Sequence, residues 1–237
     1  FDKAQASGAT CPVARDEAGG IIYGANGDPM PMYYDYNGTK YAFTGGDAIY
    51  EDVNHDGSID QYDVVYLGSS LPKLTGGFGF RLFYKGWSLN AQFNYRYSNK
   101  IANVARMMAE NMHGADNQST AVNYRWRKEG DGANGGHVLP RALYGQGYNW
   151  MGSDRFVEDG SFLRLNYLQL SYGFDSKLVK RIGLSRLNLY VSGENLFCLT
   201  KYSGVDPEVN YGSMGVTKDE AITPRAKSFT FGLTATF

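Results

Sequence analysis

The sequence contains no long hydrophobic run. None of its apolar stretches approaches the roughly 20 residues that a transmembrane helix needs, and the mean hydropathy of the chain is −0.40. A helical membrane protein is therefore excluded. A membrane-spanning β-barrel is not, because its strands need apolar residues only at alternate positions.

The sequence also lacks an excess of charge of either sign. Its 23 lysines and arginines face 24 aspartates and glutamates, which gives a formal net charge of −1. This balance removes any electrostatic case for binding nucleic acid or the headgroups of anionic lipids. The partners of the protein must be inferred from other features.

Cysteines and catalytic motifs are scarce. Cys11 and Cys198 lie far apart without a CxxC spacing, so they could be two free thiols or one disulfide. The three histidines are isolated, and the sequence has no HExxH, GxSxG or Walker motif. Residues 130–135 fit GxGxxG formally, but no strand precedes them and no apolar helix follows, so we interpret them as a loop. We expect a protein that is not an enzyme.

Glycine and aromatic residues, by contrast, are abundant. The chain has 30 glycines, 19 tyrosines and 13 phenylalanines. This composition favours aromatic-rich strands joined by tight turns over a helical bundle. We therefore predict an all-β fold.

Five segments alternate apolar and polar residues with the period of two that is typical of strands. They are residues 75–84, 87–97, 161–174, 187–196 and 228–237. Lys85 and Gly86 join the first two as a hairpin turn. The segments match the roughly 9 to 11 residues of a transmembrane barrel strand better than the roughly 5 to 6 of an average soluble strand. We predict antiparallel membrane-spanning strands with apolar residues toward lipid and polar residues toward the lumen.

The connections between these strands are alternately short and long, as in barrels with short periplasmic turns and long extracellular loops. If Phe237 lies at the periplasmic end, then loops 98–160 and 198–227 and the region 1–74 lie outside the cell. Residues 75–237 would supply barrel strands and their loops. Since five strands cannot close a barrel, we expect the working protein to contain more chain. The start at Phe1, without a methionine or a signal peptide, is expected of a processed product as well as of a fragment.

Residues 52–63 match the calcium-loop pattern D-x-[DN]-x-[DN]-G. The predicted metal ligands are Asp52, Asn54, Asp56, Ser58 through its backbone carbonyl, Asp60 and Asp63. Gly57 permits the sharp turn, and Ile59 can anchor the loop by apolar packing. Because Asp63 is shorter than the usual glutamate, occupancy stays open. The alternative is an Asx-rich turn that satisfies its own backbone.

Four ordered segments resemble the SusC/RagA-type TonB-dependent transporters of the Bacteroidota. They are residues 46–73, 157–174, 187–210 and 224–237, the last three being similar to the final barrel strands of that family. Residues 1–44 carry little of the resemblance. The alternating end of the chain, with its last aromatic residue Phe237, also resembles the signal that the barrel-assembly machinery recognises.

The resemblance implies a plugged barrel of about 22 strands in the bacterial outer membrane. The plug domain and TonB box have no counterpart in this chain, so contact with TonB would use a preceding region. A SusD-like surface lipoprotein would close over the extracellular loops, and the cargo would be an oligosaccharide or an oligopeptide.

Two features of the external segments suggest contacts. Residues 100–112 are predicted to form a helix whose methionine-rich face either packs on its own loop or meets the lipoprotein lid. Trp126, Tyr148 and Trp150 could stack on a substrate, although packed loops and interface girdles also use aromatic residues.

Our leading hypothesis is therefore part of a TonB-dependent importer. The alternatives are a secreted calcium-dependent β-sandwich in adhesion or glycan binding, and a non-transporting barrel of a surface or secretion complex. Fractionation separates the sandwich from a barrel, and the sequence upstream of Phe1 separates the two kinds of barrel.

Overall fold

A computed structural model describes residues 12–128, 130–131, 139–209 and 216–237. The chain divides into two compact units. The first unit contains residues 1–67 and 106–153, and the second contains residues 68–105 and 154–237. The predicted division between residues 74 and 75 did not anticipate that a segment of the long connection, residues 106–153, joins the first unit.

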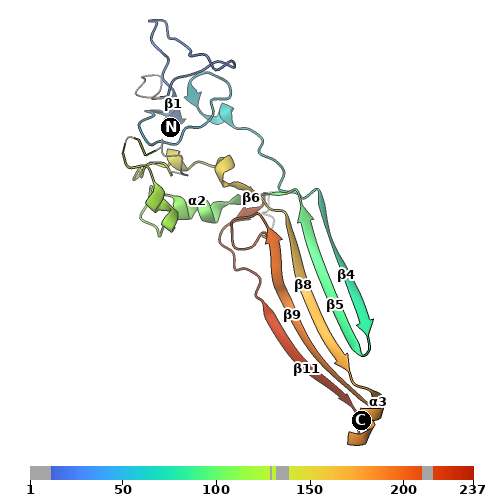
Figure 1. Ribbon diagram of the computed structural model, residues 1–237. Helices are drawn as coiled ribbons and strands as arrows, with labels where there is room; N and C mark the ends of the chain where they lie inside the picture. The colour runs from blue at the N-terminus through green and yellow to red at the C-terminus, as the bar shows by residue number, and fades with distance from the viewer. Residues whose placement is uncertain (1–11, 129, 132–138, 210–215) are drawn as a thin grey trace. The chain divides into compact units, whose positions relative to one another are not determined.

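The second unit is built on a five-stranded antiparallel sheet with the strand order β11-β9-β8-β5-β4 (Figure 1). Its strands are β4 (Leu74–Tyr84), β5 (Trp87–Tyr97), β8 (Phe162–Gly173), β9 (Arg186–Thr200) and β11 (Ser228–Thr236). Four of them agree with the predicted strands to within one residue at each end. The fifth, β9, continues four residues beyond its predicted end.

The register of the sheet places residues of one kind in rows that cross all five strands. One row joins Leu82, Leu89, Leu170, Val191 and Phe231. The next row joins Arg81, Asn90, Gln169, Ser192 and Thr230. Because successive residues of a strand point to opposite faces, one face of the sheet is apolar and the other is polar.

The apolar face is not covered by any part of the chain that the structure describes. Phe231 is 80% exposed and Leu233 is 62% exposed. These side chains therefore do not form the interior of a compact soluble core, as the sandwich alternative would require.

A bulge interrupts the alternation of β8 and β9. The pairing shifts at Asn166 in β8, which faces Asn195 and Leu196 in β9. Asn195 adopts a positive φ of 51°, and its side-chain amide donates a hydrogen bond to the carbonyl of Ala226 at 3.0 Å. The extra residues break the two-residue period in the sequence, and this explains why the prediction ended β9 too early.

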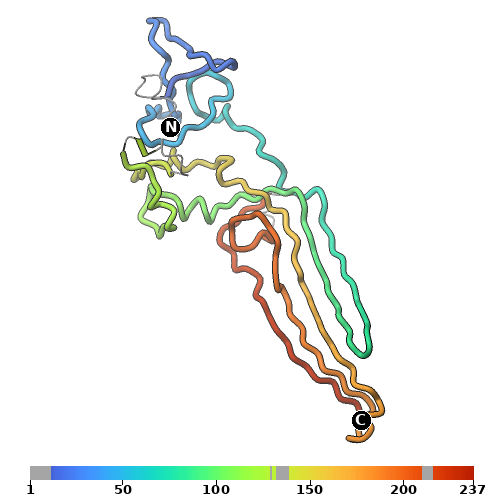
Figure 2. Tube along the Cα trace, viewed as in Figure 1, coloured from blue at the N-terminus to red at the C-terminus, as the bar shows by residue number. Residues whose placement is uncertain are grey.

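The two ends of the sheet are connected differently, as the trace in Figure 2 shows. At one end, Lys85 and Gly86 make a two-residue turn with positive φ at both positions, as predicted for a hairpin. At the same end, α3 (Ser176–Val179) and η5 (Lys180–Ile182) connect β8 to β9. The long connections leave from the other end.

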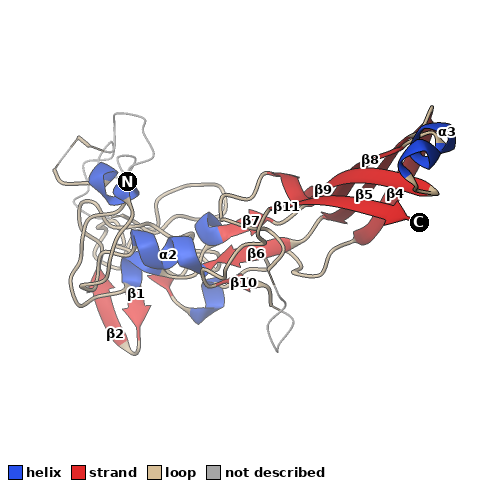
Figure 3. Cartoon of the chain, turned by 90° about the horizontal axis from the view of Figure 1, so that it is seen from below, coloured by secondary structure: helices blue, strands red, loops and turns tan. Residues whose placement is uncertain are grey.

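A small sheet with the order β10-β6-β7 lies within the second unit, at the end away from α3 (Figure 3). It consists of β6 (Lys100–Asn103), β7 (Val157–Asp159), which follows η4 (Asp154–Phe156), and β10 (Lys218–Asp219). Ile101 is fully buried beside Tyr202 and Val209. The hydroxyl of Tyr202 donates a hydrogen bond to Asp219 at 2.7 Å.

The prediction of a helix over residues 100–112 is wrong at both ends. Residues 100–103 form β6, and α2 extends only over Val104–Glu110. The tertiary pairing of β6 with β7 and β10 overrides the local helical pattern. Met108 is exposed whereas Met112 is buried, so the two methionines do not share one accessible face.

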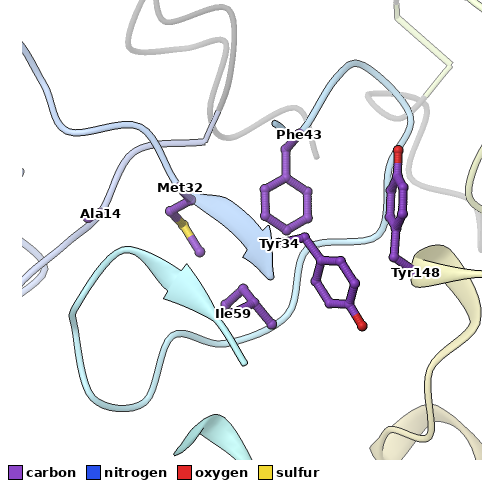
Figure 4. Close-up of a cluster of buried hydrophobic side chains, with 6 residues drawn as sticks. All are labelled: Ala14, Met32, Tyr34, Phe43, Ile59 and Tyr148. Carbon is purple, nitrogen blue, oxygen red and sulfur yellow. The ribbon is translucent and has the colours of Figure 1, made fainter. Parts of the chain in front are cut away.

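The first unit contains a three-stranded sheet with the order β2-β1-β3, made of β1 (Tyr33–Tyr36), β2 (Thr39–Ala42) and β3 (Ser58–Ile59). The first unit also contains the 3-10 helices η1 (Gln61–Asp63), η2 (Thr120–Tyr124) and η3 (Tyr148–Trp150). Figure 4 shows its core, which consists of Ala14, Met32, Tyr34, Phe43, Ile59 and Tyr148. Among the described residues, no helix is both long and apolar enough to cross a membrane.

Candidate functional site

The acidic loop, residues 52–63, folds around its own backbone. Asp52 is buried, and its carboxylate accepts hydrogen bonds from the amides of Asp56 at 3.2 Å and Gly57 at 2.8 Å. The side-chain oxygen of Asn54 also accepts from the Asp56 amide, at 3.1 Å. Gly57 has a φ of 80°, in the left-handed region that favours glycine. Its conformation thus confirms the predicted need for a sharp turn.

The end of the acidic loop is tied back to its beginning. One carboxylate oxygen of Asp63 accepts from the amide of Val53 at 2.8 Å, and the other accepts from the amide of Asp60 at 2.8 Å. Asp60 in turn caps η1 by accepting from the amide of Tyr62 at 2.7 Å. The first and last predicted ligands therefore belong to one closed loop.

The acidic loop is also attached to the core of the first unit. β3 is part of the loop, and its Ser58 and Ile59 pair with Tyr33 and Tyr34 of β1. The Ile59 side chain is buried among the core residues, as the sequence predicted. A conformational change in the loop would consequently reach the hydrophobic core.

The donor atoms of the acidic loop suit calcium, which prefers oxygen ligands. A carboxylate oxygen that accepts one N–H bond still has a lone pair for an ion. Within the described ranges, however, no three acidic, histidine or cysteine side chains converge on a point that could hold a metal ion. The hydrogen bonds of the loop are those that the self-satisfied Asx turn predicts, and calcium binding stays a prediction.

The predicted substrate residues occupy different environments. Trp126 is half-buried and lies over Gly46, where a side chain would overlap the indole ring. Tyr148 and Trp150 of η3 are 4% and 3% exposed, so both rings are buried in the interior of the first unit. Stacking on a substrate would need a different conformation of η3, and the role of these residues stays a prediction.

A buried polar network that the sequence did not reveal surrounds Tyr148. Asp47 binds the guanidinium of Arg141 at 2.6 Å and the side-chain amide of Asn149 at 3.0 Å. Arg141 also donates to the hydroxyl of Tyr148 at 3.3 Å. Burial and the nearby charge of Asp47 raise the pKa of Tyr148. The network joins segments about a hundred positions apart in the chain, and no local pattern signals such a contact.

A second buried ion cluster ties the segment after β9 to the sheet. Arg164 of β8 pairs with Asp206, and its Nε lies 3.2 Å from Glu208. Arg225 also pairs with Glu208, at 2.9 Å. A lone arginine in an apolar strand was the only sequence signal for this cluster.

Phe237 and the two cysteines are the remaining residues that the sequence analysis singled out. Phe237 follows β11 and is 93% exposed, and its carbonyl accepts a hydrogen bond from Ser185 at 3.2 Å. Its role as an assembly signal stays a prediction. Cys198 is a free thiol in β9, whereas Cys11 lies outside the described residues.

Comparisons with known proteins agree on one family of receptors. The chain is 29% identical over 199 residues to TonB-dependent receptor P3 of Formosa agariphila, covering 81% of this chain and 19% of that protein. It is 28% identical over 222 residues to TonB-dependent receptor SusC of Bacteroides thetaiotaomicron, covering 91% of this chain and 18% of SusC. The chain thus spans about a fifth of the length of these relatives. No family model matches.

A solved structure gives the same answer. The RagAB peptide importer in its closed-closed state has a TM-score of 0.61 and 25% identity to this chain, over 91% of this chain and 20% of that one. The similarity supports the antiparallel β-architecture of the sheet. Over most of its length, this chain is homologous to a segment of the SusC/RagA-type TonB-dependent receptors.

Proposed function

We propose that this chain supplies part of the wall and external loops of an outer-membrane importer that depends on TonB. The observation that carries the proposal is the five-stranded sheet, in which apolar and polar rows alternate and the apolar face is left uncovered by the described residues. Such a sheet suits a wall with hydrocarbon on one side and a polar lumen on the other.

The whole barrel would have about 22 strands, as in the class of plugged transporters. In the described part of the chain, β4 and β11 each pair with only one strand. Their outer edges need partners, because unpaired backbone groups are costly in lipid. Strands from other parts of the protein would supply them.

The orientation follows from the connections. The turn at Lys85 and Gly86 and the connection through α3 and η5 would face the periplasm. The acidic loop, the first unit and the small sheet would lie outside the cell. A SusD-like lipoprotein would cover these external segments, and TonB would act on a plug from another region of the protein. The similarity to RagAB and SusC supports both partners.

The cargo would be an oligopeptide or an oligosaccharide. RagAB is described as a peptide importer, and the exposed aromatic residues of the first unit, such as Tyr124 and Tyr144, suit sugar rings and peptides alike. In the acidic loop, calcium would have a structural role and would hold the turn against the core through Ile59 and β3.

A deletion strain tests import. Cells that lack the complete gene should lose uptake of labelled oligosaccharide or oligopeptide, and the intact gene should restore it. The matched control is the intact gene in a TonB-deficient strain, which should take up as little as the deletion strain. Uptake that persists without TonB would overturn the importer.

Fractionation tests the barrel separately. The full-length protein should remain in the outer-membrane fraction and migrate differently in electrophoresis before and after heating. Recovery from the aqueous fraction in buffer alone would refute the membrane location and favour the secreted sandwich.

A further inference from the structure

The connection between β8 and β9 gathers basic residues at one end of the sheet. Lys177, Lys180, Arg181 and Arg186 are exposed there, and Lys85 is exposed in the neighbouring turn. We call residues 85 and 175–186 the basic turn. The two parts of the basic turn are neighbours in space, because a hydrogen bond joins the residues beside them: the amide of Gly173 donates to the carbonyl of Gly86 at 2.9 Å.

The basic turn departs from the charge balance of the chain. It contains five basic side chains and one acidic side chain, Asp175, whereas the whole chain has a net charge of −1. Asp175 caps α3 by accepting from the amide of Lys177 at 2.8 Å. None of the five basic side chains forms an ion pair with another described residue. The net charge of the whole chain gave no reason to expect binding to anionic lipids, but it conceals this local positive surface, so that exclusion does not hold for the basic turn.

Two exposed apolar side chains accompany these charges. Leu178 is 58% exposed and Ile182 is 68% exposed, four positions apart in consecutive helical turns. Val179 between them is buried and attaches the segment to the structure. A short segment with exposed aliphatic and basic side chains is suited to the interface between membrane and water.

The apolar face of the sheet ends in aromatic rings beside the basic turn. The ring centroids of Trp87 and Tyr172 are 4.8 Å apart, and those of Tyr172 and Phe174 are 5.0 Å apart. Aromatic belts mark the interfaces of membrane proteins. Basic residues immediately beyond such a belt lie at the depth of lipid headgroups, which long lysine and arginine side chains can reach.

We propose that the basic turn binds the headgroups of anionic phospholipids in the periplasmic leaflet of the outer membrane. Lys177, Lys180 and Arg181 would contact phosphate oxygens, while Leu178 and Ile182 would enter the edge of the hydrocarbon. The proposal rests on the proposed function, since it requires that this end of a membrane-spanning sheet faces the periplasm. The proposal goes beyond that function, because it assigns a lipid ligand to the basic turn.

The test uses the full-length protein in phosphatidylcholine liposomes with spin-labelled lipids. Electron paramagnetic resonance measures the relative association of labelled phosphatidylglycerol and labelled phosphatidylcholine with the protein. We expect the wild type to prefer phosphatidylglycerol, and we expect high salt to weaken the preference. The triple variant Lys177→Gln, Lys180→Gln, Arg181→Gln should lower it at least three-fold.

A matched triple variant in the external segments, Lys40→Gln, Lys128→Gln, Lys218→Gln, should keep the preference of the wild type. An unchanged lipid preference in the basic-turn variant, or an equal loss in the matched variant, would overturn the proposal. The basic turn would then be available to bind an acidic periplasmic protein in place of lipid. Lipid immobilisation without any headgroup preference would refute the proposal while supporting the barrel. Absence of immobilised lipid of either kind would refute the barrel itself.

Discussion

Leu82 of β4 and Phe231 of β11 belong to the same apolar row, although three strands separate them in the sheet. Each of the five strands contributes one residue to the row. A face built in this way is specified by long-range register as well as by the alternation in each strand. Changes on the two faces should consequently have very different effects.

Replacement of Phe231 by lysine tests this asymmetry. The charge would face the hydrocarbon, and we expect the free energy of unfolding to fall by about 2–4 kcal/mol near the centre of the bilayer. The measurement is urea unfolding of the full-length protein in liposomes. The neighbouring change Thr230→Lys on the polar face is the control and should cost much less. Equal losses for the two variants would contradict the two-faced sheet.

The packing of Tyr190 on Gly232 gives a second prediction. A side chain at Gly232 would overlap the Tyr190 ring of the neighbouring strand. Gly232→Ala should therefore destabilise the protein by about 1–3 kcal/mol through overpacking. The measurement is the temperature at which the full-length protein loses the electrophoretic mobility of its folded form.

Gly173→Ala in β8 is the matched control, since a side chain there would meet only atoms at 3.9 Å. The double variant Gly232→Ala, Tyr190→Ser should regain part of the lost stability. A double variant as unstable as the sum of its single changes would argue against this contact.

Calcium should stabilise the acidic loop if the proposed structural role is correct. At a hundred-fold excess over the dissociation constant, a bound ion adds about 2.7 kcal/mol to the free energy of unfolding. We expect calcium to raise the melting temperature of the wild type and to have less effect on Asp56→Asn, as measured by calorimetry with magnesium as the reference ion.

Asp116→Asn, at an exposed aspartate outside the loop, should respond to calcium like the wild type. A wild-type melting temperature that is indifferent to calcium would favour the self-satisfied Asx turn.

Alkaline pH should weaken the first unit through Tyr34. Burial, followed by the nearby Tyr50 and Tyr36, raises the pKa of Tyr34 above its ordinary value of 10.0. Above pH 10 the unfolded chain loses this proton before the folded protein does, so stability falls as pH rises. The contribution is fully present below pH 10. We expect Tyr34→Phe to flatten the dependence of unfolding free energy on pH in this range.

Tyr144→Phe, at an 83% exposed position, is the matched control and should leave the slope unchanged. An identical slope for Tyr34→Phe and the wild type would show that Tyr34 does not control alkaline stability.

The sequence predicted the long strands well because their alternation is local and regular. The same rule failed where structure depends on distant partners. β9 passes through a bulge that interrupts the period, and β6 forms only by pairing with β7 and β10. The pairing of Asp47 with Arg141 and of Arg164 with Asp206 likewise joins distant segments.

The candidate site shows the same division. The predicted ligand positions of the acidic loop rest on spacing within 12 residues and stay a prediction, whereas its turn at Gly57 and its apolar anchor at Ile59 were predicted correctly. The burial of Tyr148 and Trp150 could not be predicted, because an aromatic residue in a loop is compatible with the interior and the surface alike. Tertiary packing alone decides between these environments.

The five strands of the large sheet lie side by side in the order in which they occur along the chain, with no crossover between them. The long segment between β5 and β8 can therefore change in length without displacing any row of paired residues in the sheet, but β6, β7 and Tyr148 within it are held by contacts elsewhere in the chain. An insertion is consequently best tolerated at the exposed residues 115–117, which belong to no strand and to no core cluster, and there it should leave the register of all five strands unchanged.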